Sequence, residues 1–232
     1  MTVVLPGFHA VKHALRFDAS IAQLVTVDQA KLAALAADLA PDLADAFAAA
    51  VAVTPAELAE LADLVPASGV AAVATKPSVD AAEVWASADH RPVVVLEEPT
   101  HHGNIGAVVR VAAAAEAAGV LTTGPLDPWH PAALRGSAGL HFAMRVARVA
   151  AVPDGGEPLV AWDPAGTPLA DTALPAGGRH AFGSERRGLS PALLRRADTV
   201  VAIPMRPGVS SLNLATSVAV ALYSLPQPLP DS

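Results

Sequence analysis

The stretch RPVVVLEEPTHHGNIGAVVR, residues 91–110, joins an apolar β-branched run to a polar loop and the start of a helix. The run Val93–Glu97 is typical of a buried strand. The helix is expected over Ile105–Ala118, with Gly119 as its C-cap. A buried strand that passes through a polar loop into a helix predicts an α/β fold whose chemistry lies in such loops.

The same alternation of strands and helices continues toward the C-terminus. Short buried strands joined by helices predict a mostly parallel sheet, and the ligands of such sheets usually lie beyond the carboxyl ends of the strands. Further strands are expected near Val120–Thr123, Arg145–Ala150, Leu159–Trp162, Ala181–Gly183 and Val200–Ile203, and a further helix over Ser211–Ser224.

The residues before this region predict a separate small domain. Residues 1–90 hold 4 Lys/Arg and 11 Asp/Glu, whereas residues 91–232 hold 11 of each. The polar segment SADHRP at 87–92 is the expected linker, which gives an α/β/α domain over 1–87 and a catalytic domain over 91–228. The expected elements of the first domain are a helix after Gly7, a strand at Ile21–Val27, a helix from Asp28, a helix at Pro55–Leu64 with a Thr54/Glu57 capping box, and a strand at Val70–Thr75.

Composition narrows the class of protein. The 232 residues are 53% apolar, so a sizeable core can form, and the net charge of −7 provides no general basic field for nucleic acid. The absence of cysteine excludes disulfides and thiolate metal sites. The sequence shows neither a secretory signal nor a membrane span, so we expect a soluble, cytoplasmic protein that contacts no membrane.

Several common site motifs are absent. The chain contains no G-x-G-x-x-G dinucleotide fingerprint and no P-loop. FGSERRG is not a nucleophile elbow, so Ser184 is expected in a turn or cap. His101 and His102 are adjacent and have no third ligand at metal spacing, so we expect no metal site.

Three loops taken together resemble the signature motifs of the SpoU (TrmH) family of SPOUT-class RNA methyltransferases. The link LRGSAGLHFAMRV, residues 134–146, also resembles the family, so the likeness spans residues 91–225. The three motifs are carried by EEPTHHGNIGAVVR (97–110) through Asn104, Gly106 and Arg110, by FGSERRGLS (182–190) through Gly183, Ser184, Glu185, Gly188 and Leu189, and by IPMRPGVSSLNLATSVAVAL (203–222) through Ile203, Pro204, Met205, Ser211, Leu212 and Asn213.

The resemblance implies a parallel sheet with a C-terminal deep trefoil knot, a homodimer, and S-adenosylmethionine as cofactor. It assigns proton removal to Arg110, although an arginine of ordinary pKa is a poor base, so a lowered pKa, a substrate phosphate or a purely electrostatic role all remain open. The other implied catalytic residues are Asn104, Glu185, Ser211 and Asn213. The implied cofactor contacts are Thr123, Gly124, Gly183, Ile203, Met205 and Leu212.

The first domain resembles the L30e-like RNA-binding domain that precedes the catalytic domain in ribosomal RNA members of the family, since Gly7–Leu15 matches its opening. His9, Lys12, His13 and Arg16 fall on one face of a helix, as phosphate contacts require. The acidic charge of the domain leaves a structural or dimerising role open. If it reads RNA, deleting residues 1–90 should leave cofactor binding intact and weaken methylation.

The predicted function is transfer of a methyl group to the ribose 2′-hydroxyl of structured RNA, with ribosomal RNA favoured by the extra domain. A transfer-RNA 2′-O-methyltransferase is the alternative within enzymes, and a non-catalytic RNA-binding assembly factor is the alternative outside them. Leu214, Val218 and Leu222 form an apolar stripe that we expect at the dimer interface, unless a monomer buries it in its own core.

Overall fold

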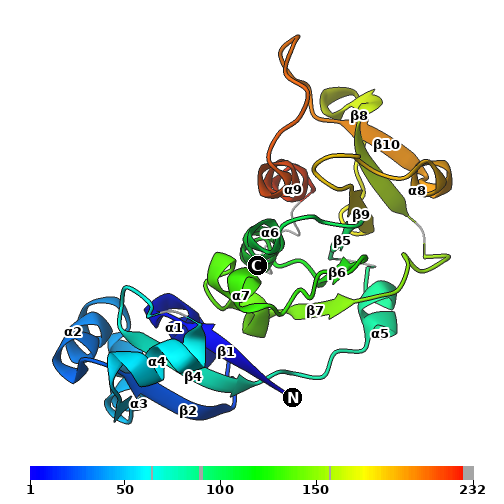
Figure 1. Cartoon of the computed structure of the whole chain (residues 1–232). Helices are drawn as coiled ribbons and strands as arrows, with labels where there is room; N and C mark the ends of the chain where they lie inside the picture. Colours follow the sequence, from blue (N-terminus) through cyan, green and yellow to red (C-terminus); the bar gives the residue numbers. More distant parts are fainter. Residues whose placement is uncertain (64, 89–90, 157, 227–232) are drawn as a thin grey trace, which may run out of the picture. The chain divides into compact units, whose positions relative to one another are not determined.

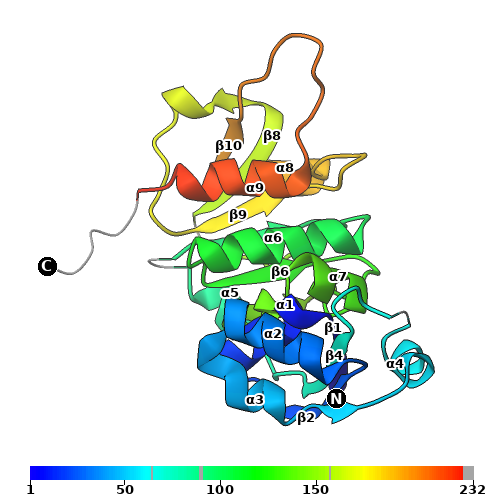
Figure 2. The same cartoon turned by 90° about the vertical axis from the view of Figure 1, so that its left-hand side faces the viewer.

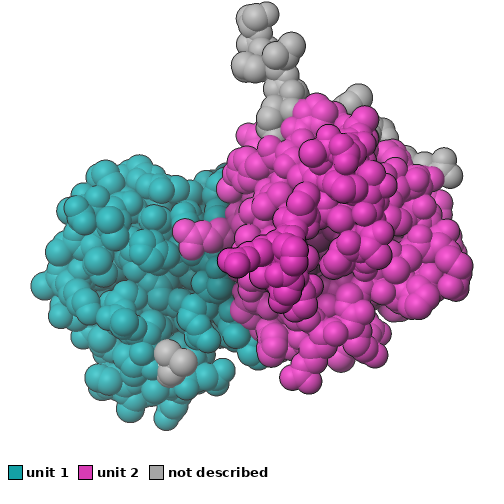
Figure 3. Space-filling model, turned by 90° about the horizontal axis from the view of Figure 1, so that it is seen from above, with its two compact units in different colours: residues 1–78, 129–143 teal, residues 79–128, 144–232 magenta. Residues whose placement is uncertain are grey.

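The computed structural model of the chain describes residues 1–63, 65–88, 91–156 and 158–226. Contacts divide it into two compact units (Figure 3). Unit 1 comprises residues 1–78 and 129–143, and unit 2 comprises residues 79–128 and 144–232. Residues 64, 89–90 and 227–228 of the expected helix, linker and catalytic domain lie outside the described residues.

Unit 1 is built on a four-stranded mixed sheet. β4 lies between β1 and β2 and is antiparallel to both, while β3 adds to the edge of β2 in parallel. The two strands expected here, β2 and β4, are confirmed, whereas β1 and β3 were not predicted. The strands are β1 (Thr2–Pro6), β2 (Ile21–Thr26), β3 (Val51–Ala52) and β4 (Val70–Thr75).

Helices cover this sheet. Asp28 caps α2 by accepting from the Lys31 amide at 2.9 Å, and Thr54 and Glu57 form the expected capping box. Ala71 packs with α4, and its neighbour Ala72 on the opposite face of β4 is also fully buried, so both faces of the strand are covered. The helices are α1 (Phe8–Arg16), α2 (Gln29–Leu39), α3 (Ala44–Ala48) and α4 (Pro55–Ala62), with a 3₁₀ turn η1 at Pro41–Leu43.

A segment from the middle of the chain completes unit 1. Residues 129–143 form α7 (Pro131–Gly136) and the 3₁₀ turn η2 (Leu140–Ala143). Gly139 has a φ of +81°, and a Cβ there would collide with the backbone of Ala10 in α1. The contacts therefore divide the chain differently from the expected single boundary at 87–91, because the close approach at Gly139 brings a distant segment onto α1.

Unit 2 contains a six-stranded sheet in the order β10-β8-β9-β5-β6-β7. Every neighbouring pair is parallel, which confirms the predicted parallel sheet. The trefoil knot stays a prediction. The strands are β5 (Val93–Leu96), β6 (Gly119–Thr122), β7 (Arg145–Arg148), β8 (Leu159–Pro168), β9 (Arg179–Phe182) and β10 (Thr199–Ala202).

Helices lie on both faces of this sheet (Figure 1). Val84 of α5 and Leu193 of α8 pack against one face with Val93 and Val95. α6 and α9 lie side by side against the other face (Figure 2). The helices are α5 (Ala81–Ala86), α6 (His102–Ala114), α8 (Pro191–Arg196) and α9 (Leu214–Tyr223), and a 3₁₀ turn η3 covers Leu169–Asp171.

The end of α6 differs from the prediction. The helix stops at Ala114, and Gly119 is the first residue of β6 rather than a C-cap. Glu116 takes the left-handed conformation instead, with a φ of +54°, and the amide of Ala117 donates to the carbonyl of Ala112 at 2.9 Å. The expected C-cap was wrong because Glu116 makes the left-handed turn that the sequence assigned to a glycine.

The apolar stripe on α9 is buried within one chain. Leu214, Val218 and Leu222 are 7%, 0% and 1% exposed, so the expectation that they form a dimer interface was wrong. They lie in the core of unit 2, on the helix that α6 contacts. Among the described residues, no helix is long and apolar enough to cross a membrane.

Candidate functional site

The first two motif loops meet because their strands are neighbours. β5 and β9 are paired in parallel, with Leu96 opposite Phe182. The Glu97 amide continues the ladder by donating to the Phe182 carbonyl at 2.9 Å. The loops after both strands therefore leave the sheet side by side at its carboxyl edge, as predicted for the chemistry-bearing loops.

The Glu185 carboxylate joins the second motif to the first, and Asn104 joins the third motif to them. Oε1 accepts from Asn104 Nδ2 at 2.6 Å, and Oε2 accepts from the Thr100 hydroxyl at 2.6 Å and the Thr100 amide at 3.0 Å. Asn213 Nδ2 in turn donates to Asn104 Oδ1 at 3.3 Å. Three of the predicted catalytic residues thus form one hydrogen-bonded cluster, together with Thr100, which lies in the first motif loop but was not among the predicted site residues.

The cluster keeps Glu185 ionised. Burial alone raises the pKa of this carboxyl, but the hydrogen bonds from Asn104 and Thr100 outweigh burial and hold the pKa below its usual value. At neutral pH both oxygens of Glu185 are therefore acceptors already in use. Such a carboxylate orients its neighbours and cannot supply a proton.

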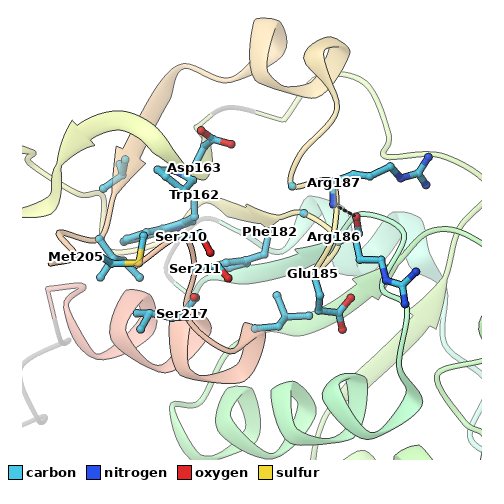
Figure 4. Close-up of a pocket in the computed structure, with 18 residues that line it drawn as sticks. Trp162, Asp163, Phe182, Glu185, Arg186, Arg187, Met205, Ser210, Ser211 and Ser217 are labelled. Atoms are coloured by element: carbon cyan, nitrogen blue, oxygen red, sulfur yellow. Dashed lines mark hydrogen bonds between the residues drawn. The ribbon is translucent and has the colours of Figure 1, made fainter. Parts of the chain in front are cut away.

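A cavity of about 400 Å³ lies beside the cluster (Figure 4). Trp162 and Phe182 form a stacked aromatic wall, with ring centroids 5.9 Å apart and planes 6° from parallel. No sequence pattern predicted this wall, although both residues fall in expected strands. The predicted site residues that line the cavity are Gly183, Glu185, Ile203, Met205, Ser211 and Leu212.

Thr123 and Gly124 do not line this cavity. They follow β6, and the Thr123 hydroxyl accepts from the Glu98 amide at 3.0 Å. Gly124, at a φ of +81°, approaches the backbone of the same Glu98. The structure therefore shows these two residues supporting the loop after β5, and their cofactor contact stays a prediction.

The loop over 183–190 is closed on itself. The amides and carbonyls of Ser184 and Gly188 pair across it, and the Ser184 hydroxyl accepts from the Arg187 amide at 3.2 Å, as expected for a turn residue. A Cβ at Gly183 would collide with the backbone of Gly188. Ser190 then caps α8 and donates its amide and hydroxyl to Glu97, each at 2.7 Å.

Arg110 stands apart from the cluster. It lies on α6, six residues after Asn104, with an exposed side chain. It does not line the cavity and does not contact the Glu185 cluster. It makes no hydrogen bond or ion pair to the part of the chain that the structure describes. Its role in proton removal stays a prediction.

The predicted RNA-binding stripe lies on α1 in unit 1, and two of its members have partners within the unit. Arg16 makes two hydrogen bonds to the Asp42 carboxylate, at 2.6 and 2.9 Å. His13 Nδ1 lies 2.7 Å from the Ala138 carbonyl, and burial lowers the pKa of this imidazole. His9 and Lys12 share the face, but the stripe is not a set of uncommitted cations.

Within the described ranges, no three His, Cys, Asp or Glu side chains gather closely enough to hold a metal ion.

The chain is similar to proteins that are named as RNA methyltransferases. An uncharacterized tRNA/rRNA methyltransferase of Mycobacterium tuberculosis is 37% identical over 169 residues, which are 67% of this chain and 58% of that protein. This chain therefore spans less than two thirds of that relative. The 23S rRNA (guanosine(2553)-2′-O)-methyltransferase RlmP of Bacillus subtilis is 28% identical over 242 residues, covering 97% of this chain and 88% of RlmP.

The fold is also similar to that of a solved structure over almost the whole length of this chain. The SpoU methyltransferase AviRb from Streptomyces viridochromogenes, in complex with AdoMet, superposes with a TM-score of 0.75 at 26% identity, covering 96% of this chain and 88% of AviRb. Residues 91–223, more than half of the chain, match the sequence profile of one family. The chain belongs to the SpoU rRNA Methylase family.

Proposed function

We propose that this protein transfers a methyl group from S-adenosylmethionine to the 2′-hydroxyl of a ribose in ribosomal RNA. The observation that carries the proposal is that three motif loops are joined through Asn104 and Glu185, beside a cavity. The names of RlmP and of the AdoMet complex of AviRb support it, since both proteins match this chain over nearly all of its length. Ribosomal RNA is in the cytoplasm, where we place the protein.

The cavity fits the proposed donor. Its volume of about 400 Å³ lies in the usual range for small-ligand sites. The flat wall of Trp162 and Phe182 suits a purine, and the serine hydroxyls and backbone groups suit the polar remainder. When bound, the donor supplies a methyl group made electrophilic by its sulfonium. The residues that would hold it are Gly183, Ile203, Met205 and Leu212.

The remaining site residues act on the acceptor in this proposal. Asn104 is held at both ends of its amide, by Glu185 and by Asn213, so its orientation is set before RNA arrives. Ser211 is exposed at the cavity and can hydrogen-bond near the phosphate. Arg110 would assist removal of the hydroxyl proton, directly or by its charge. Alignment of the ribose oxygen with the methyl group lowers the barrier by making the attack effectively unimolecular.

The proposal includes a homodimer, as the resemblance implies. The stripe of Leu214, Val218 and Leu222 is excluded from the interface because it is buried. The opposite face of α9 carries Tyr223, which is 62% exposed. Sedimentation at micromolar concentration, with Tyr223→Ala as the variant, tests whether this face holds two chains together.

The test of function is a transfer assay with purified full-length protein. Donor labelled in its methyl group is incubated with 23S ribosomal RNA or with bulk transfer RNA, and the RNA is digested with alkali. Label in an alkali-resistant dinucleotide from ribosomal RNA is the expected result, because a 2′-O-methyl group blocks cleavage at that position.

Other outcomes overturn the proposal in defined ways. Label in transfer RNA alone establishes the transfer-RNA enzyme. Label in mononucleotides shows base methylation. Tight RNA binding with no label in either RNA, together with no binding of S-adenosylmethionine by calorimetry, establishes a non-catalytic assembly factor.

A further inference from the structure

Thr100 occupies a place that the family motifs leave unassigned. It lies in the loop after β5, directly before His101, the N-cap of α6. We propose that Thr100 is a positioning residue of the transfer site, a proposal that rests on the proposed function. Thr100 holds the Glu185 carboxylate in place as a clamp, and Glu185 in turn holds the Asn104 amide toward Asn213.

The clamp has a definite geometry. Both donors of Thr100, its hydroxyl at 2.6 Å and its amide at 3.0 Å, reach the same oxygen, Oε2 of Glu185. Oε1 is thereby left for Asn104 Nδ2 at 2.6 Å. A carboxylate fixed at both oxygens has a fixed plane, and short hydrogen bonds to an ionised acceptor are the strong ones. Thr100 therefore fixes the plane of the carboxylate whose free oxygen Asn104 meets.

Asn104 connects the Thr100–Glu185 pair to the third motif. Asn104 donates to Glu185 with Nδ2 and accepts from Asn213 Nδ2 with Oδ1. Asn213 uses its own Oδ1 to cap α9, through the amides of Ala215 and Thr216. Each side chain in this line has its donor and acceptor ends committed. Releasing Thr100 from Glu185 therefore loosens Asn104, and neither Thr100 nor Asn104 lines the cavity.

Charged and titratable side chains surround Glu185 on three neighbouring segments: β8, its own loop and the start of α6. Asp163 of β8 and Arg186 and Arg187 of its own loop line the same cavity, and His101 and His102 stand at the start of α6. Arg187 is paired with Glu98 at 2.5 Å. The Asn104 and Thr100 hydrogen bonds lower the pKa of Glu185. Losing the Thr100 hydroxyl should raise that pKa.

The experiment compares Thr100→Val, which removes the hydroxyl at constant shape and keeps the amide, with Thr100→Ser, which keeps both donors. Full-length proteins are measured for kcat and KM on ribosomal RNA, for S-adenosylmethionine affinity by calorimetry, and for titration of the Glu185 carboxyl carbon by NMR, assigned with Glu185→Gln. Thr100→Ala is the second variant if Thr100→Val unfolds.

We expect Thr100→Val to lower kcat by about tenfold or more, the size of one hydrogen bond to a charged group, with donor affinity unchanged. The Glu185 titration should move to higher pH. Thr100→Ser should restore both. Unchanged kcat and titration in Thr100→Val, or equal losses in Thr100→Ser, overturn the proposal. If the wild type methylates no RNA, the proposed function fails, and the titration still decides whether Thr100 clamps Glu185.

Discussion

The motif segments of unit 2 and the basic side chains of unit 1 differ in whether their positive charges are paired. In unit 1, Arg16 pairs with Asp42, Lys31 donates to the Ala67 carbonyl at 2.8 Å, and Lys76 lies over the Trp129 ring at 5.4 Å. In unit 2, Arg110 and Arg206 are exposed and occur in the motif segments themselves. Arg110 and Arg206 are thus accessible to phosphates, whereas Arg16, Lys31 and Lys76 make contacts within unit 1.

The units also differ in how distant segments are joined. Unit 2 ties its loops together with carboxylates, through Glu97 to Ser190, Glu98 to Arg187 and Glu185 to Thr100. Unit 1 instead receives residues 129–143 by close backbone approach at Gly139. Unit 1 therefore includes part of the chain between the first two motifs, so it is not one continuous segment of the sequence.

The largest expected effect is that of deleting residues 1–90, which should abolish binding of S-adenosylmethionine, contrary to the expectation from sequence. The deletion removes α5, whose Val84 and Trp85 belong to the core of unit 2, and it strips α1 from residues 129–143. Near-ultraviolet circular dichroism and calorimetry measure the loss. Deleting residues 1–78 keeps α5 and serves as the control. Wild-type affinity in the longer deletion would restore the picture of independent domains.

The next effect concerns Arg110. Arg110→Ala should lower kcat at least about a hundredfold, the usual contribution of a group that assists proton transfer. Donor affinity should stay within a few-fold, because Arg110 does not line the cavity. The matched control is Arg195→Ala, an exposed arginine on α8. Near-normal turnover of Arg110→Ala with saturating RNA would remove Arg110 from the site.

A third effect distinguishes the histidines of the two units by pH. Burial lowers the pKa of His180 in unit 2 to about 4, while its Nδ1 accepts from the Trp162 indole at 3.1 Å. Below the unfolded pKa of ~6.5 the unfolded chain binds a proton that the folded chain refuses, so stability is full above pH 6.5 and falls toward pH 4, by about 3 kcal/mol in total.

Urea unfolding between pH 7 and pH 4 measures this loss. His180→Asn keeps an acceptor for Trp162 without titrating, so most of the pH dependence should disappear in that variant. Burial also lowers the pKa of the half-buried His13 in unit 1, with the same sign. A pH dependence that survives in His180→Asn and disappears in His13→Asn would place the sensitive group in unit 1.

The smallest effect concerns RNA affinity. Arg186→Gln and Arg206→Gln should each weaken RNA binding several-fold and reduce the salt slope by about 0.7–0.9, since each removes one cation available to a phosphate. Arg16→Gln should change binding little, because Asp42 already neutralises Arg16. Filter binding at several salt concentrations measures both. A larger loss in Arg16→Gln would return the RNA contact to α1.

Much of the site was readable from sequence because its signals are local. The N-caps at Asp28 and Thr54 form within three residues, and the apolar composition of β4 is enough to predict a strand. Asn104, Glu185 and Asn213 were implied by the resemblance to the SpoU family, whose motifs are short strings within single loops. Each of these features depends on neighbours along the chain, so no knowledge of the fold was needed.

Only the tertiary structure decided which distant residues meet. Thr100 reaches Glu185 across 85 positions, and the pairing follows from β5 and β9 being neighbours in the sheet. The burial of Val218 and the placing of Gly139 against α1 follow in the same way from how whole elements pack. Periodicity shows that a face is apolar, but whether that face meets its own core or a second chain depends on contacts between residues far apart in sequence.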